Sequence, residues 1–145
     1  MVTVSDQAVA TFTSTSDGVI TVGDDPQSEG VLTITGEGSL VQSTGGTAQW
    51  WIGGSSNDSG GTGTLNILDG GQATTTGRAV ISYGTNAHGS LIIDGAGSQF
   101  DVNGDYLLVG FNGVGNAQVT DGGILNVNRM FVADAAGSAG SQLDI

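Results

Sequence analysis

The sequence predicts an all-β protein folded as a right-handed parallel β-helix, with about five coils of roughly 26 residues and three short strands in each coil. Three observations predict this fold class. Apolar pairs recur at nearly constant spacing, glycine accounts for 27 of 145 residues with a single proline, and no segment has helical periodicity. Apolar residues make up 37% of the chain and are mostly Val, Ile and Leu, which suit a pleated surface.

The first strand of each coil is predicted from a pair of apolar residues separated by one residue. The first members of successive pairs lie 30, 33, 26, 26 and 26 residues apart, and three equal intervals in a row are hard to obtain by chance. A glycine usually stands two residues before the pair. The pairs are Val2/Val4, Leu32/Ile34, Leu65/Ile67, Leu91/Ile93, Ala117/Val119 and Leu143/Ile145.

Two further strands are predicted in each coil from short alternations of apolar and polar residues, the period-2 pattern of a half-buried strand. The inward residues predicted for the second strand are Ala10/Phe12, Leu40, Ala73/Thr75, Phe100/Val102 and Leu125/Val127. Those predicted for the third strand are Ile20/Val22, Trp50/Ile52, Ala79/Ile81, Leu107/Val109 and Met130/Val132.

The turns after the first strands alternate between two types. Residues 36–39 and 95–98 share the pattern Gly-x-Gly-Ser, whereas residues 69–71 and 121–123 share Asp-Gly-Gly, and residues 6–8 occupy the matching place in the first coil. Glycine and aspartate are typical of tight turns because both tolerate positive φ angles. The coils therefore form a two-coil repeat.

A single coil cannot fold alone, because its few inward side chains do not offset the entropy of ordering its backbone. Stacked coils share a continuous core and pair their backbones. We expect one interior column parallel to the long axis, formed by Leu32, Leu65, Leu91, Ala117 and Leu143.

The whole chain, residues 1–145, is predicted to be one domain. Residues 1–17 form a partial first coil, 18–132 the regular coils and 133–145 a partial last coil. The chain starts and stops on the same strand of the coil without a polar or helical cap, although solenoids need capped ends to hide their open edges. This predicts a fragment of a longer shaft, or a subunit whose ends pair with copies of itself.

The stretch 81–132 carries a family resemblance. Its segment Gly-Ser-Leu-Ile-Ile-Asp-Gly-Ala-Gly-Ser, residues 89–98, followed by Leu-Leu-Val-Gly at 107–110, resembles the repeat of type V autotransporter passengers and PEP-CTERM-linked secreted proteins. The match covers most of the chain from about Gly18 onward, with Ser82 and Ala133 standing where the pattern usually has glycine. The resemblance implies a parallel β-helix exported by a Gram-negative bacterium. It implies no particular activity, because the repeat is a shaft rather than a site.

Composition excludes several classes of partner. Lysine is absent, Arg78 and Arg129 are the only basic residues apart from His88, and the net charge is −12. This balance argues against nucleic acid, which requires a basic surface, and against anionic membranes. The chain has no cysteine and no apolar run of 18 residues, so neither disulfides nor direct membrane insertion are expected.

The best candidate for a contact surface is Trp51, next to the longest turn at residues 53–63. Adjacent strand residues point to opposite faces, so Trp50 should be interior and Trp51 exposed. Asn57 and Asp58 lie within the same turn and complete the candidate surface. An alternative is that Trp51 covers apolar surface of a neighbouring coil.

Catalytic and metal sites are weakly indicated. Asp6, Asp69 and Asp121 occupy equivalent places and could act as the carboxylates of a polysaccharide-degrading enzyme, but turn chemistry explains all three. The run Asp101-x-Asn103-x-Asp105 resembles half of a calcium loop without the later bidentate glutamate. His88 has no second histidine or cysteine to complete a metal site. We therefore expect no enzyme activity and no cofactor, with calcium as a weak alternative.

The predicted function is that of a rigid, non-catalytic passenger or shaft segment of a secreted or cell-surface protein, acting in adhesion or surface projection. It would be extracellular or on the outer surface of a Gram-negative bacterium. Its partners would be a host-cell or glycan surface, or copies of itself stacked end to end as a filament or surface-layer subunit. A β-helix enzyme that degrades polysaccharide is the most distant alternative.

Overall fold

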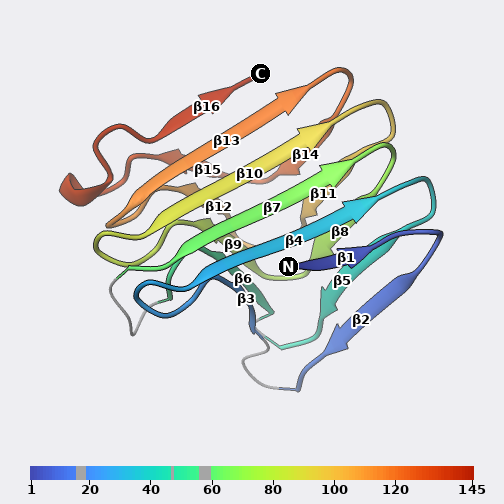
Figure 1. The fold of residues 1–145 in the computed structure, drawn as a ribbon, viewed down its shortest axis with the longest axis horizontal. Coiled ribbons are helices and arrows are strands. Elements are labelled where there is room, and N and C mark those ends of the chain that lie inside the picture. The colour runs from blue at the N-terminus through green and yellow to red at the C-terminus, as the bar shows by residue number, and fades with distance from the viewer. Residues whose placement is uncertain (16–18, 47, 56–59) are drawn as a thin grey trace.

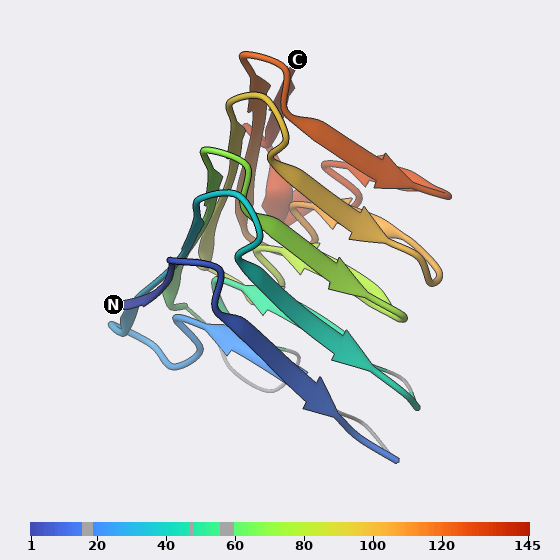
Figure 2. The same cartoon turned by 90° about the vertical axis from the view of Figure 1, so that its right-hand side faces the viewer.

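The computed structural model describes residues 1–15, 19–46, 48–55 and 60–145, and these form a β-solenoid of about five turns. Three parallel sheets run along it, as Figure 1 shows, and the coils are stacked in chain order, as Figure 2 shows. In the first sheet the strands lie in the order β1 (Val2–Val4), β4 (Glu29–Thr35), β7 (Thr62–Leu68), β10 (His88–Asp94), β13 (Val114–Thr120) and β16 (Gln142–Asp144).

The second and third sheets have five strands each. The second contains β2 (Val9–Thr13), β5 (Leu40–Thr44), β8 (Gln72–Thr75), β11 (Gln99–Val102) and β14 (Ile124–Val127). The third contains β3 (Val19–Val22), β6 (Gln49–Ile52), β9 (Arg78–Ile81), β12 (Leu107–Val109) and β15 (Met130–Val132). One short 3₁₀ turn, η1 (Ala136–Ser138), follows β15. In the described residues no helix is long and apolar enough to cross a bilayer.

Each coil thus runs through the three sheets and turns three corners. We call the turn from the first to the second sheet the first corner, the next the second corner, and the return to the following coil the third corner. The first to fifth coils contain β1–β3, β4–β6, β7–β9, β10–β12 and β13–β15.

Neighbouring strands pair in parallel and in register along the first sheet. Leu32 pairs with Leu65, Leu65 with Leu91, Leu91 with Ala117 and Ala117 with Leu143. The first four of these side chains are at most 8% exposed, and Leu143 packs against them from the last strand. One side of each strand therefore contributes to a continuous core, and stacking supplies the burial that a single coil lacks.

The second sheet differs from the expected pattern in the second coil. Leu40 was predicted to point inward, and this prediction is wrong: Leu40 pairs with Val9 and Gln72 on the outer face. Val41 and Ser43 point inward instead and are 2% and 3% exposed. The apolar pattern misplaced this strand because one of its two inward positions is a serine.

Ser43 can be interior because its hydrogen bonds are made inside the core. Trp50 Nε1 donates to Ser43 Oγ at 2.7 Å, and Ser43 Oγ donates to Thr75 Oγ1 at 3.0 Å. Thr75 Oγ1 in turn donates to the backbone oxygen of Ala48 and accepts from the backbone nitrogen of Gly77. A buried polar network is tolerated when its members are satisfied in this way.

The third corner begins in the same way in each coil. The residue after the third strand has a positive φ of 55–80°, which is the left-handed region. Gly89 then opens the next strand so close to this corner that an added Cβ would lie 2.5 Å from the nitrogen of Ser82 and 2.4 Å from the oxygen of Ile52. Close backbone approach therefore explains the glycine that precedes the apolar pair in the second to fifth coils. The five left-handed residues are Gly23, Gly53, Ser82, Gly110 and Ala133.

Candidate contact surfaces at the corners of the coils

Trp51 lies on the outer face of β6, as its place beside the interior Trp50 predicts. Trp50 is fully buried, whereas Trp51 is half-buried and pairs in register with Thr21 and Val80. The Trp51 ring lies 5.8 Å from the ring of Tyr83, which belongs to the next coil. Trp51 therefore covers a neighbouring coil while part of its surface remains accessible.

Tyr83 and Phe111 extend this contact into an aromatic row. Their ring centroids are 5.0 Å apart, and both side chains are half-buried. The backbone nitrogen of Tyr83 donates to Gly53, and that of Phe111 donates to Ser82, so the two aromatic residues occupy equivalent places one coil apart. We call Trp51, Tyr83 and Phe111 the aromatic row. Such tilted pairs contribute about 0.5–1.5 kcal/mol each beyond their buried area.

Sequence reasoning selected Trp51 but missed Tyr83 and Phe111. The sequence contains a pattern that could have identified them: each directly follows the left-handed residue that opens the third corner. Aligning the corners, rather than the strands, would have placed both aromatic residues in one column. The predicted contact residues Asn57 and Asp58 lie outside the described residues.

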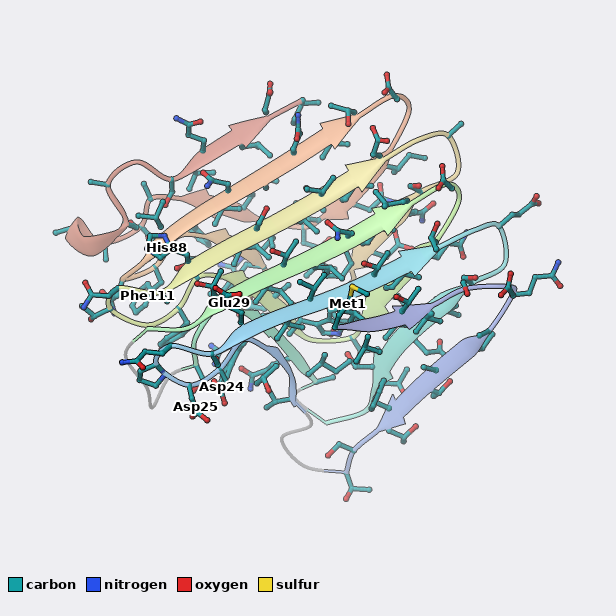
Figure 3. The ribbon with its side chains drawn as sticks, viewed as in Figure 1. Met1, Asp24, Asp25, Glu29, His88 and Phe111 are labelled. Carbon is teal, nitrogen blue, oxygen red and sulfur yellow. The ribbon has the colours of Figure 1, made fainter. Side chains whose placement is uncertain are left out.

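Acidic side chains lie beside the aromatic row, at the edge where the third corner meets the first sheet (Figure 3). In Figure 3 Asp24, Asp25, Glu29, His88 and Phe111 lie along the edge where the third corner meets the first sheet. Glu29 and His88 are exposed, and both pair with Thr62, which separates them by two strand spacings. Those spacings place Glu29 and His88 about 10 Å apart along the stack, too far for one ion to bridge.

The remaining acidic candidates do not converge. Asp101 accepts hydrogen bonds from Gln99 and Asn126, whereas Asp105 forms an ion pair with Arg129. The calcium-like run is thus divided between separate partners. No group of three His, Cys, Asp or Glu side chains in the described parts of the chain is placed to hold a metal ion.

Asp6, Asp69 and Asp121 occupy the first corner with positive φ angles of 57°, 51° and 49°. The Asp69 carboxylate accepts a hydrogen bond from Thr35 of the preceding coil at 3.2 Å. Left-handed backbone at these positions is the conformation that turn aspartates adopt, so these residues shape the corner. Each lies two coils from the next, since the first corners of the second and fourth coils are of the other type.

The second corner gathers the two arginines. Arg78 Nε donates to Gln49 Oε1 at 2.7 Å and Arg78 Nη1 donates to the Tyr106 hydroxyl at 2.8 Å. The Arg78 guanidinium also lies 5.8 Å from the centroid of the Tyr106 ring, and Phe131 packs edge-on against Tyr106. Arg129 instead pairs with Asp105 at a site where both side chains are more than half exposed.

Comparisons with family models, with curated proteins and with solved structures give no significant match to this chain. The candidate surfaces are therefore interpreted from their own geometry.

Proposed function

We propose that this chain is a rigid, non-catalytic shaft segment of a secreted or cell-surface bacterial protein, and that it acts in surface projection or adhesion. The observation that carries the proposal is the division between a regular interior and variable corners. The interior column keeps one register from coil to coil, and three parallel sheets follow it. A backbone ladder of this kind resists bending and leaves the corners free to differ.

Three further features support this role. The charge of −12 and the absence of lysine favour a solvated surface that repels copies of itself. The chain holds its coils together without cysteine, which suits a protein that folds after export irrespective of oxidants. The resemblance of residues 81–132 to passenger repeats supports a location outside a Gram-negative cell.

The aromatic row is the part of the surface that we assign to adhesion. Aromatic side chains supply a large contact area at low entropic cost, and they are enriched in protein contact sites. The row follows the stacking direction over three coils, so an extended ligand such as a glycan chain can lie along it. Half-burial of each ring fixes its orientation before a partner binds.

Adhesion is tested by immobilising the purified chain and measuring the retention of cells and of an array of glycans. Tyr83→Ala and Phe111→Ala should reduce retention at least tenfold, because each removes one ring of the row. Gln118→Ala is the matched control, since Gln118 is exposed on the outer face of β13 and away from the row. Thermal melting of each variant separates lost contact from lost folding.

Location is tested independently on intact cells of the producing bacterium. An antibody against the folded chain should label unpermeabilised cells or the culture medium, and external protease should remove the cell-bound signal. Labelling only after permeabilisation would refute the proposed location. Retention unchanged in both aromatic variants would refute the assignment of the aromatic row.

A further inference from the structure

A groove of about 400 Å³ opens at the second corner, on a different edge of the solenoid from the aromatic row. Its volume lies within the range of about 300–1,000 Å³ that small-molecule sites occupy. Residues from three successive coils line it. The lining residues that matter here are Ala48, Gln49, Thr76, Gly77, Arg78 and Asp105.

Arg78 is held rigidly in this groove. Its Nε and Nη1 atoms donate to Gln49 and Tyr106, and its guanidinium lies over the Tyr106 ring. These three contacts come from the coils on either side of Arg78, so they fix the side chain from both directions. The Nη2 group keeps its hydrogen-bond donors, since none of the contacts that Arg78 makes with the described residues uses it.

Arg78 forms no ion pair with the described residues. Among residues 1–15, 19–46, 48–55 and 60–145, no carboxylate lies within 4.0 Å of Arg78, and the ion pair found there joins Arg129 to Asp105. Arg78 is half-buried, and a cation withdrawn from water without a counter-ion is costly. An acidic chain that keeps such a cation beside a groove provides a site for an anionic ligand.

Neutral polar groups complete the site. Because the Gln49 Oε1 atom accepts from Arg78, the Gln49 amide nitrogen is left with two donors, and the Thr76 hydroxyl is exposed at the same groove. Asp105 also lines the groove, and its carboxylate is a hydrogen-bond acceptor. One of its oxygens already accepts from Arg129. The groove therefore offers one cationic donor, neutral donors and one anionic acceptor.

We propose that this groove binds a carboxylate-bearing sugar, namely a hexuronic acid unit of an acidic polysaccharide. The ligand carboxylate is held by Arg78 and Gln49, because charge-assisted hydrogen bonds to a guanidinium are the strongest available. Ligand hydroxyls donate to Asp105 and accept from Thr76. The Asp105 carboxylate in the groove disfavours a dianionic group such as phosphate beside Arg78, whereas a single carboxylate with adjacent hydroxyls suits both ends of the groove.

The proposal is independent of the adhesive role of the aromatic row, and its test uses the wild-type chain first. Trigalacturonic acid is titrated into the ¹⁵N-labelled protein at millimolar concentration, and the side-chain signals of Arg78 Nε–H and the Gln49 amide are followed. The neutral galactose trimer, sodium acetate and sodium phosphate form the comparison arms. We expect both side-chain signals to shift in a saturable manner with trigalacturonic acid, and at least tenfold weaker binding in the other arms.

Variants then locate the binding site. Arg78→Gln should weaken trigalacturonic acid binding at least tenfold, and Arg78→Lys should do so to a lesser extent because it keeps the charge but loses the planar fork. Gln118→Ala is the control, because Gln118 lies on the outer face of β13 and outside the groove, and it should change affinity less than threefold. Thermal melting shows whether each variant is folded.

Three results would overturn the proposal. They are the absence of saturable shifts with trigalacturonic acid, equal binding of the neutral trimer or of phosphate, and unchanged affinity in folded Arg78→Gln. The first two are obtained on the wild-type chain, so they hold even where the Arg78→Gln variant does not fold.

Discussion

The first and third corners of the coils differ in how regular their turns are. In the first corner the turns stack closely, and glycines of one coil lie against the turn of the coil before it. For example, a Cβ added to Gly70 would lie 3.3 Å from the Cα atom of Glu37. The third corner starts uniformly at its left-handed residue and then varies in length, from residues 110–113 in the fourth coil to residues 133–141 in the fifth. Both corners adjoin the in-register first sheet, so strand pairing constrains only the residues nearest the strands.

The first corner is held by buried serines on alternate coils. Ser98 is fully buried, and its Oγ accepts from the Gly70 nitrogen of the coil before and donates to the Asp94 oxygen of its own coil. Ser39 plays the same part toward the nitrogen of Gln7. This explains the two-coil repeat: the Gly-x-Gly-Ser turn supplies the acceptor and the Asp-Gly-Gly turn supplies the donor. The third corner is also hydrogen-bonded from coil to coil, as from Tyr83 to Gly53 and from Phe111 to Ser82, while the rings of Tyr83 and Phe111 pack along its outer side.

The largest expected effect comes from the point where the third corner returns to the first sheet. Gly89→Ala places a Cβ against backbone atoms of Ile52 and Ser82, which cannot move without breaking strand pairing. We expect a loss of more than about 4 kcal/mol in the free energy of unfolding, a value reached only by severe disruptions. Urea unfolding followed by circular dichroism measures it.

Gly140→Ala is the matched control for this prediction. Gly140 has a φ of +96°, but nothing lies within 4 Å of an added Cβ. Its cost is therefore limited to backbone strain of about 1–2 kcal/mol. Equal losses at the two glycines would contradict close backbone approach as the reason for glycine at position 89.

The interior column should show the next largest effect. Leu91→Ala removes a fully buried side chain between Leu65 and Ala117 and should lower the free energy of unfolding by about 2–5 kcal/mol. Ile92→Ala, on the outer face of the same strand, should cost less than about 1.5 kcal/mol, because Ile92 is already partly exposed. Similar losses in the two variants would contradict the assigned faces of β10.

Removal of the serine hydroxyl that accepts a hydrogen bond in the first corner should lower the free energy of unfolding by a smaller amount. Ser98→Ala leaves the buried Gly70 nitrogen without a partner, which should lower the free energy of unfolding by about 1–3 kcal/mol. Ser90→Ala on the neighbouring strand β10 provides the comparison, since Ser90 lies on the outer face. Faster amide hydrogen exchange at Gly70 in Ser98→Ala alone would confirm the mechanism, and unchanged exchange would contradict it.

The smallest effect is a gain in stability at the third corner. Ala133 opens this corner in the fifth coil with a φ of +55°, a conformation that costs a residue with a Cβ about 1–2 kcal/mol. Ala133→Gly should therefore raise the free energy of unfolding by about 0.5–1 kcal/mol. Ala135→Gly, at a φ of −129°, should lower it slightly, and a gain in both variants would refute the conformational explanation.

The sequence was sufficient to predict the three strands per coil and their order, because equal spacing and period-2 alternation both reflect a core that repeats with every coil. It misplaced Leu40 because the interior of β5 includes Ser43, whose burial depends on Trp50 and Thr75. It missed the aromatic row and the Arg78 groove for a related reason. These sites combine side chains from two or three coils, so they become visible only when the register of the corners is known.

The central claim is that successive windings lie in register around one interior column. Methyl–methyl nuclear Overhauser effects in a methyl-labelled sample test it most directly. The account predicts strong cross-peaks from Leu32 to Leu65, Leu65 to Leu91 and Leu91 to Ala117, with Leu32 and Leu91 too far apart for one of comparable strength. Strong cross-peaks that skip a coil, or the absence of the three nearest-neighbour peaks, would contradict the stacked solenoid.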